Sequence, residues 1–533
     1  MISKLPLDLL ENIFTYLDGF DFVSLSHLNK KMYQRMYPIG LLYKLRVVEL
    51  WPKVTVRLFQ NEFNLEQLDS ISLLLKLMKW KVSGIAFLND IQPTMDEFEK
   101  LEKNVGNLLM FKEDIFTEIH IIMRNGLLLD TISKNISVYG NLKTLRVDQG
   151  LTNDFFLSLI PWVPNSKLTT LQISNDDRNI DSSLLGKLFS ILPTTRISTL
   201  ILNINPLGSN WELAGSLGID SSISIDEFVE ITKVFTHETI IQIEGPLALA
   251  CVLPHTKITE LGLNHFFFQR LSPIFLISKG ILPKVKKFYL QGRTCSHSYT
   301  LAQGEISETA FSLIYSELEY IFSGLHSSQL EEIEFIGTMG FETVINLINN
   351  LPVSKLRRLK GDIPTNRFKD FLQVESDLKE LHLIGKDSDE KCKVILENIQ
   401  HLNYEKFTIQ ITLNGLEPLI SKLDMCTLKH LDLSNSDFGN SATPTLGIYL
   451  PISKLETLSL RNCGIGDAGA KCISNFVHYT TLVSLDLREN DISLDAIKAF
   501  NRTVDGSIVR SVDGKDITTE YRLKRVKFSK KKA

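Results

Sequence analysis

The sequence predicts an α/β solenoid, a stack of repeated strand–helix units, from three observations. The pattern L-x-x-L-x-L returns every 27 residues near the C-terminus, starting at Leu428, Leu455 and Leu482. Weaker copies continue upstream in one register to about Val82. Leu-Pro pairs precede several of the predicted strands, and each proline ends a helix because it lacks an N–H and disfavours helix at the residue before it. The 533 residues therefore need no division into globular domains, because each unit packs only on its neighbours.

The C-terminal copies resemble leucine-rich repeats. Two of them continue with Cys463 and Ile465, and with Asn490 and Ile492, which completes the pattern L-x-x-L-x-L-x-x-(N/C)-x-L. Residues 465–471 are similar to the helix start of the ribonuclease-inhibitor type of repeat. The resemblance implies a ribonuclease-inhibitor-like horseshoe lined by a parallel sheet, with the leucines pointing inward and the Asn or Cys satisfying backbone groups at the turn.

About fifteen units are expected, several of them degenerate. The upstream copies begin near Val82, Phe116, Leu142, Leu168, Ile197, Ile241, Ile258, Val285, Leu330, Leu356, Leu378 and Ile409. The Leu-Pro pairs are Leu192-Pro193, Leu253-Pro254, Leu282-Pro283, Leu351-Pro352 and Leu450-Pro451. Residues 208–224 and 294–308 interrupt the period and are expected to be insertions.

The N-terminus predicts a small bundle of three helices that resembles the F-box. Leu5-Pro6 opens an amphipathic stretch, and Asp21 can cap a second helix. The Trp usual late in the motif is not obvious, with Tyr33 or Tyr43 in its place. In the family this end contacts a Skp-type adaptor, so the resemblance implies adaptor binding by Leu5, Pro6, Leu9, Leu10, Ile13, Phe14 and Leu17. The alternative is a generic helical cap on the repeats, with these residues facing inward.

Composition and charge favour an intracellular protein that binds other proteins. Six scattered cysteines without a C-x-x-C pair are typical of a reducing compartment. We expect no signal peptide and no membrane span, and therefore a cytoplasmic or nuclear location. The net charge is −4, but residues 522–533 carry seven basic and no acidic residues, so the rest sums to −11. The acidic body argues against a nucleic-acid surface, and the basic tail is a solvated end, a nuclear address or an arm for an acidic partner.

The sequence contains no catalytic constellation and no metal-ligand spacing, and we expect neither enzymatic activity nor a cofactor. One pattern resembles a dinucleotide site: Gly464, Gly466 and Gly469 form G-x-G-x-x-G, and Asp486 follows Gly466 by 20 residues. The repeat explains the same residues, with the glycines in a turn and Asp486 on the next strand. We therefore favour the turn over the cofactor site.

Candidate target-binding residues lie on the predicted strands at positions that alternate with the leucines. Such residues point away from the core and form columns across adjacent strands. Tyr and Arg are enriched at binding hot spots. The candidates are Tyr289, His382, Asp432, Arg461, Asp486 and Arg488. A second expectation on the same columns is that Glu331, Glu332 and Glu334 pair with Arg357, Arg358 and Lys360 of the next unit.

Together the two resemblances imply the substrate receptor of a Skp-cullin-F-box ubiquitin ligase. The N-terminal helices would bind the adaptor, and through it a cullin, while the repeats hold an unidentified target protein. Two alternatives remain open: an adaptor-bound scaffold without target ubiquitination, and a regulator of a small GTPase. The expected organisation is an F-box-like domain at 1–48, a helical linker at 49–81, the solenoid at 82–506, and a cap with the basic tail at 507–533.

Overall fold

The computed structural model describes twelve segments of the chain. They are residues 84–89, 118–123, 140–147, 153–206, 213, 216–219, 223–243, 245–264, 274–291, 318–384, 388–398 and 404–503. The F-box-like residues, the expected linker, the insertion at 294–308 and the basic tail lie outside them. The chain divides into two compact units, Met1–Ala302 and Gln303–Ala533.

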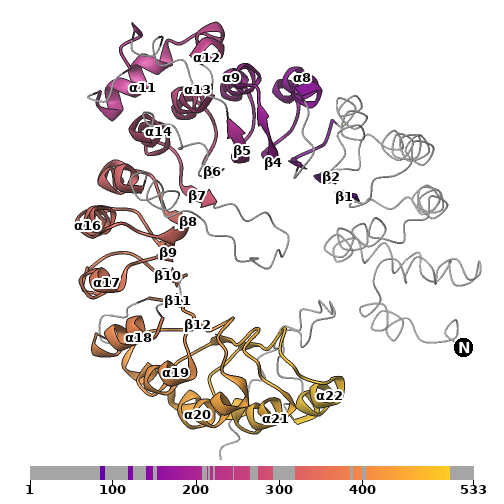
Figure 1. Ribbon diagram of the computed structural model, residues 1–533, viewed down its shortest axis with the longest axis vertical. Coiled ribbons are helices and arrows are strands. Elements are labelled where there is room, and N and C mark those ends of the chain that lie inside the picture. The colour runs from indigo at the N-terminus through magenta and orange to yellow at the C-terminus, as the bar shows by residue number, and fades with distance from the viewer. Residues whose placement is uncertain are drawn as a thin grey trace, which may run out of the picture. The chain divides into compact units, whose positions relative to one another are not determined.

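In the described part of the first unit, parallel strands follow one another in sequence order, and helices α8, α9, α13 and α14 lie on one side of them (Figure 1). The strands are β1 Gly84–Asn89, β2 Glu118–Met123, β3 Thr144–Val147, β4 Thr170–Ile180, β5 Thr199–Pro206, β6 Glu260–Asn264 and β7 Lys287–Gln291. The helices are α8 Asn153–Trp162, η4 Val163–Asn165, α9 Ser182–Ile191, η5 Leu192–Thr194, α11 Ile225–Lys233, α12 His237–Ile243, α13 Gly245–Val252, η6 Leu253–His255 and α14 Ile274–Ile281, where η marks a 3-10 helix.

The second unit repeats this arrangement, and each α-helix packs on the next (Figure 1). Its strands are β8 Glu332–Thr338, β9 Arg358–Asp362, β10 Glu380–Leu383, β11 Lys406–Thr408, β12 His430–Asp432, β13 Thr457–Ser459 and β14 Ser484–Asp486. Its α-helices are α16 Phe341–Asn350, α17 Thr365–Leu372, α18 Ser388–Glu397, α19 Leu413–Ile420, α20 Ala442–Tyr449, α21 Asp467–Phe476 and α22 Leu494–Thr503. Its 3-10 helices are η8 Leu325–Ser327, η9 Leu351–Val353, η11 Leu423–Met425, η12 Gly439–Ser441, η13 Leu450–Ile452 and η14 Val477–Tyr479.

The central apolar residues of successive strands are register partners, which confirms the predicted solenoid. In the second unit the row is Ile333, Leu359, Leu381, Phe407, Leu431, Leu458 and Leu485. Each of them is at most 2% exposed. The core is therefore a continuous apolar layer between strands and helices, and a repeat cannot bury its own leucines without its neighbours.

Two of the predicted copies are wrong in detail. The residues near Ile241 form helix α12, and β5 pairs directly with β6, so no strand lies at that position. The copy placed at Ile409 and Ile411 has its strand earlier, at β11, where Tyr404, Phe407 and Ile409 are buried. Tyr404 and Phe407 replace leucines there, which is why the pattern was read in a shifted frame.

The Leu-Pro pairs end helices as predicted, and at several of these corners a hydroxyl completes the stop. Pro193, Pro254, Pro352 and Pro451 each lie in a 3-10 helix directly after an α-helix. A Ser or Thr follows the 3-10 helix, donates its hydroxyl to the carbonyl three residues earlier and accepts the N–H two residues later. These residues are Ser166, Thr195, Thr256, Ser328 and Ser354. In these copies the hydroxyl lies two residues before the first apolar residue, a regularity that the sequence reading missed.

Candidate interaction surface

The second unit has an open face, formed by the two rows of strand residues that flank the buried central residue. The first row is Glu332, Arg358, Glu380, Lys406, His430, Thr457 and Ser484. The second row is Glu334, Lys360, His382, Thr408, Asp432, Ser459 and Asp486. Side chains alternate along a strand, so these rows point away from the leucine core and the helices.

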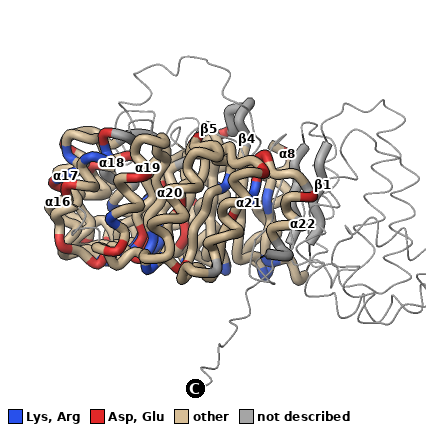
Figure 2. Tube along the Cα trace, turned by 90° about the horizontal axis from the view of Figure 1, so that it is seen from below, with Lys and Arg blue, Asp and Glu red and all other residues tan. Residues whose placement is uncertain are grey.

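The charges of strands β8–β10 are paired across the open face. Arg358 lies between Glu332 and Glu380, with N···O distances of 3.8 and 3.6 Å, and Lys360 pairs with Glu334. The predicted pairing across adjacent repeats is therefore confirmed for Glu332 and Glu334. Acidic and basic residues are interspersed along this unit rather than gathered by sign (Figure 2). Half-exposed pairs of this kind contribute little stability, but they leave the surface without a strong field of one sign.

His382 differs from the exposed anchor that the sequence suggested, because it is only 7% exposed. Its Nε2 lies 3.3 Å from a Glu380 carboxylate oxygen, and its Nδ1 lies 2.7 Å from the Thr408 hydroxyl. A carboxylate only accepts, so Nε2 carries the proton and Nδ1 accepts from Thr408. Burial lowers the pKa of His382, although the hydrogen bond that the ring donates to the Glu380 carboxylate opposes this. The ring therefore joins two strands and offers little surface of its own.

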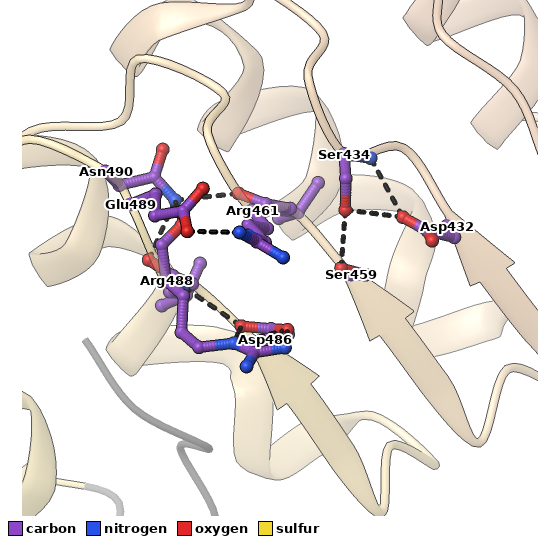
Figure 3. A network of polar contacts seen from close by, with 10 residues as sticks. Asp432, Ser434, Ser459, Arg461, Asp486, Arg488, Glu489 and Asn490 are labelled. Carbon is purple, nitrogen blue, oxygen red and sulfur yellow. Dashed lines mark hydrogen bonds and ion pairs between the residues drawn. The ribbon is translucent and has the colours of Figure 1, made fainter. Parts of the chain in front are cut away.

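On strands β12–β14 the two rows carry hydroxyl groups together with Asp432 and Asp486, and Arg461 and Arg488 follow the strands (Figure 3). Asp432 accepts from the Ser434 backbone N–H at 3.0 Å and from its hydroxyl at 2.5 Å, and the Ser434 hydroxyl lies 2.7 Å from that of Ser459. Asp486 accepts two N–H groups of the Arg488 guanidinium, at 3.0 and 2.6 Å. This fork-like pairing raises the pKa of Arg488 and fixes its direction.

Arg461 is held by Glu489, which has an unusual backbone conformation (Figure 3). Asn435, Asn462 and Glu489 occupy the same position in three successive repeats with φ of 63°, 53° and 60°. Asn tolerates this left-handed region and Glu seldom adopts it. Asn462 continues a side-chain ladder to Asn435 at 3.0 Å, whereas Glu489 pairs with the Arg461 guanidinium. The strained backbone of Glu489 therefore occurs at the residue whose carboxylate holds the Arg461 guanidinium.

The predicted candidates do not all come together. Asp432, Arg461, Asp486 and Arg488 lie on or directly after three consecutive strands of the second unit. Tyr289 is half-buried on β7 of the first unit. The adaptor residues Leu5, Pro6, Leu9, Leu10, Ile13, Phe14 and Leu17 lie outside the described residues. Four of the six candidates therefore lie on or just after the last three strands of the second unit.

The G-x-G-x-x-G stretch is the turn from strand β13 to helix α21 within one repeat. The backbone N–H groups of Gly466 and Gly469 both donate to Asn440 Oδ1, at 2.8 and 3.0 Å. A Cβ on Gly469 would lie 2.5 Å from that oxygen, so glycine is required for this approach. The donors that would bind a phosphate at a helix N-terminus are already used by Asn440 of the preceding repeat. The predicted turn is confirmed.

Asn490 and Cys463 act as the repeat pattern predicts. Asn490 Oδ1 accepts the N–H groups of Cys463 and Ile465 at 2.9 and 3.0 Å, and its Nδ2 donates to Leu460 and Leu487 carbonyls. Burial raises the pKa of the Cys463 thiol to about 12. Within the described segments no three His, Cys, Asp or Glu side chains gather as a metal site. None of the helices described is long and apolar enough to cross a bilayer.

Comparison with known families now gives the class of the protein. Residues 424–442, 452–474 and 478–500 match the leucine-rich repeat family, in agreement with the stacked strand–helix units. The fold and the open face are those of a leucine-rich-repeat protein. Residues 2–36 match the F-box domain, so the chain combines an N-terminal F-box with leucine-rich repeats.

The curated relatives are ribonuclease inhibitors. The pig protein is 35% identical over 127 residues, 22% of this chain and 27% of the inhibitor. The mouse protein is 32% identical over 140 residues, 24% of this chain and 31% of the inhibitor. The chain thus spans less than a third of the relatives that it matches, and the likeness is one of repeat type.

Two solved structures align with this chain at low identity and low TM-score. The complex of Rad7 and Elc1 in yeast aligns over 96% of this chain and 97% of the other, with 11% identity and a TM-score of 0.32. A protein from Bacteroides fragilis aligns over 52% of this chain and 79% of its own, with 15% identity and the same TM-score. Neither alignment supports a conclusion about partners.

Proposed function

We propose that this protein is the substrate-recognition subunit of a Skp-cullin-F-box ubiquitin ligase. The observation that carries the proposal is the F-box match at residues 2–36 in a chain whose later residues form leucine-rich repeats with an open polar face. The F-box binds a Skp-type adaptor, which connects the chain to a cullin, and the repeats bind a target protein. The chain itself performs no chemistry. It raises the effective concentration of target lysines near the ubiquitin-conjugating enzyme.

The adaptor contact is assigned to Leu5, Pro6 and the apolar residues that follow at helical spacing. The double substitution Leu5→Ala and Pro6→Ala is expected to abolish co-purification of the adaptor with the tagged full-length chain. The urea unfolding of the repeats should stay unchanged, because the substituted residues precede them by more than 70 positions. Adaptor recovery equal to that of the unsubstituted chain would refute the assignment.

The target contact is assigned to the end of the open face formed by β12–β14, with Asp432, Arg461, Asp486 and Arg488 as its anchors. Two guanidinium groups there are held in position by carboxylates, so little side-chain entropy is lost on binding. The surface combines both signs of charge with hydroxyl groups, which suits a folded target with mixed polar groups. Tyr289 of the first unit remains a separate candidate.

The experiment compares proteins that co-purify with the chain and with its Arg461→Ser, Arg488→Ser variant. Lys360→Ser is the matched control, because Lys360 is a paired cation on the charged part of the same face. A target should be lost from the double variant and retained by the control, and it should carry ubiquitin only when Leu5 and Pro6 are intact. A partner lost in the same way that never gains ubiquitin indicates the scaffold instead.

A further inference from the structure

Three exposed apolar side chains form a row along the edge of the second unit where the helices lead back into the strands. Met425, Ile452 and Tyr479 are the last residues of η11, η13 and η14, and they are 61%, 60% and 70% exposed. They are separated by one repeat each, 27 residues. We call these three residues the edge row. Single exposed apolar residues are ordinary, but an aligned row of them marks an interaction site.

The fold does not require apolar residues at these corners. In η4, η5 and η8 the same position holds Asn165, Thr194 and Ser327, which are exposed as well. In η11 and η13 the first residue fills the core, as Leu423 and Leu450 show at 1% exposure, and Val477 of η14 is half-buried. The backbone thus turns the third residue outward whatever its type, and the apolar character of the edge row needs another explanation.

The row is continuous, because the turns that carry it lie side by side. The Thr481 hydroxyl, two residues after Tyr479, lies 3.3 Å from the Ser453 carbonyl, one residue after Ile452. Adjacent repeats are about 5 Å apart along the strands and about 8–10 Å apart along the helices, and the edge row lies between. A partner must therefore present three apolar groups with separations of roughly 5–10 Å, as residues i, i+4 and i+7 of an α-helix do.

The backbone of these turns favours a helix over an extended segment. The N–H groups of Cys426, Ser453 and Thr480 each donate to the first carbonyl of their own 3-10 helix. The Ser453 and Thr480 hydroxyls donate to the same carbonyls, of Leu450 and Val477. An extended peptide on this edge would find few backbone partners and leave its own groups unsatisfied, whereas a helix satisfies its backbone internally.

Two lysines beside the row define the polar side of the partner. Lys422 Nζ donates to the Leu396 carbonyl at 3.1 Å, and Lys454 Nζ lies 3.5 Å from the Asp424 carbonyl. Each ammonium group has three donors, so those contacts leave donors for a carboxylate. Asp424 is the acidic residue within η11 itself, and the exposed Lys429 nearby pairs with Glu456. Lys429 and Glu456 offset each other, and Lys422 and Lys454 outnumber Asp424. The net charge of these residues beside the row is therefore positive.

From these observations we infer that the edge row binds an amphipathic α-helix of a partner protein, with an apolar stripe on Met425, Ile452 and Tyr479 and with Asp or Glu residues opposite Lys422 and Lys454. This surface is separate from the open face, whose side chains lie on the strands. The inference does not depend on the adaptor or on the target proposed above.

Photo-cross-linking in the full-length chain tests the inference. A benzophenone amino acid replaces Ile452 in the cells from which the chain comes, and the same replacement of Thr194 is the control at an equivalent polar corner. The expected product joins position 452 to a helical segment with apolar residues at i, i+4 and i+7 and at least two carboxylates. Absence of a product specific to position 452, or a product with a second copy of this chain or with an extended segment, overturns the inference.

A synthetic peptide of the cross-linked segment then provides an affinity by fluorescence anisotropy with the unlabelled full-length chain. The variant Ile452→Ser, Tyr479→Ser should bind it at least about tenfold more weakly, because both anchors lose their apolar contact. Val353→Ser is the matched control, since Val353 is 65% exposed at the same corner of η9 but stands outside the row. Equal weakening in both variants, or in neither, overturns the inference. Urea unfolding checks that all variants fold.

Discussion

At the residue scale, a hydroxyl after several of the 3-10 helices links helix end to strand start. Ser354 is 8% exposed, donates to the Leu351 carbonyl at 2.8 Å and accepts the Leu356 N–H at 3.3 Å. The same two bonds recur with Thr at positions 195 and 256. A small hydroxyl-bearing side chain is thus needed where the chain has no regular backbone pairing.

Replacing Ser354 by alanine should lower the free energy of unfolding by about 1–2 kcal/mol, because the Leu356 N–H loses its acceptor in a buried turn. Ser354→Thr is the control and should stay close to the original stability, since threonine serves at equivalent corners. Urea denaturation measures both. If the alanine and threonine variants unfold at the same urea concentration, the hydroxyl does not stabilise the turn.

His382 makes the stability of the second unit sensitive to pH. Its folded pKa is lowered from 6.5, mainly by burial, so the unfolded chain takes up a proton at a pH where the folded chain does not. The free energy of unfolding should therefore fall as the pH drops below about 6.5, toward the lower folded pKa. His382→Gln should weaken this dependence in urea titrations from pH 7 to 5. His237→Gln, at an exposed position on α12, should leave it unchanged.

The side chains around His382 also show what the sequence could not reveal at this scale. The alternation of the strand correctly placed it opposite the leucines. Its burial depends on Thr408, which is 26 residues away and lies in the copy whose frame was misread. The corner hydroxyls, in contrast, were visible as a Ser or Thr two residues before the first apolar position. The outward corners of the edge row follow from the sequence only if a 3-10 helix is assumed after the α-helix.

At the scale of elements, helix α21 depends on a residue from the preceding repeat. Asn440 Oδ1 accepts two N–H groups of its first turn, a position at which helices need a cap. Asn440→Ala should lower the free energy of unfolding by about 1–2 kcal/mol. Asn440→Asp, which keeps the acceptor oxygen near a positive helix end, should lose less or none. Thermal unfolding of the two variants gives the comparison, and equal losses would exclude the cap.

Strands were predictable where the leucine pattern followed a Leu-Pro pair that ends a helix. The strands after Leu192-Pro193, Leu253-Pro254 and Leu351-Pro352 lie where expected, because proline fixes the helix end and the register follows. The pattern failed where apolar residues occur without such a stop, as at Ile241, which belongs to helix α12. Helical and strand spacing cannot be distinguished in so short an apolar run.

At the scale of the whole molecule, the F-box and the last repeats are expected to act independently. Arg461→Ser with Arg488→Ser should leave adaptor co-purification at its original level, because those residues are more than 400 positions from the F-box match. Leu5→Ala with Pro6→Ala should leave target binding intact and remove only its ubiquitination. Quantitative pull-downs with both variants measure this. Loss of both partners in either variant would contradict separate sites.

The sequence defined the two kinds of module but not the surface that selects a target. Repeats and F-box are visible because they depend on regularly spaced apolar residues. The surface depends on which side chains of different repeats meet, such as Arg461 with Glu489, 28 residues apart. Such pairings follow from the register of adjacent strands. That register can be assigned only when the strand of every repeat is placed on the correct residues.

In the last three repeats, side chains of one repeat hold the helix start of the next. Asn440 serves the helix of the repeat after its own, and Asp467 does so in turn by accepting the backbone N–H and hydroxyl of Ser493, which precedes α22. Removal of the last repeat would leave the helix before it with its cap, whereas removal of an upstream repeat would strip the cap from the helix downstream. Asn490 of the last repeat in turn accepts the N–H groups of Cys463 and Ile465 in the repeat before it. Neighbouring repeats at this end therefore depend on each other in both directions, and removal of the last repeat should also lower the free energy of unfolding.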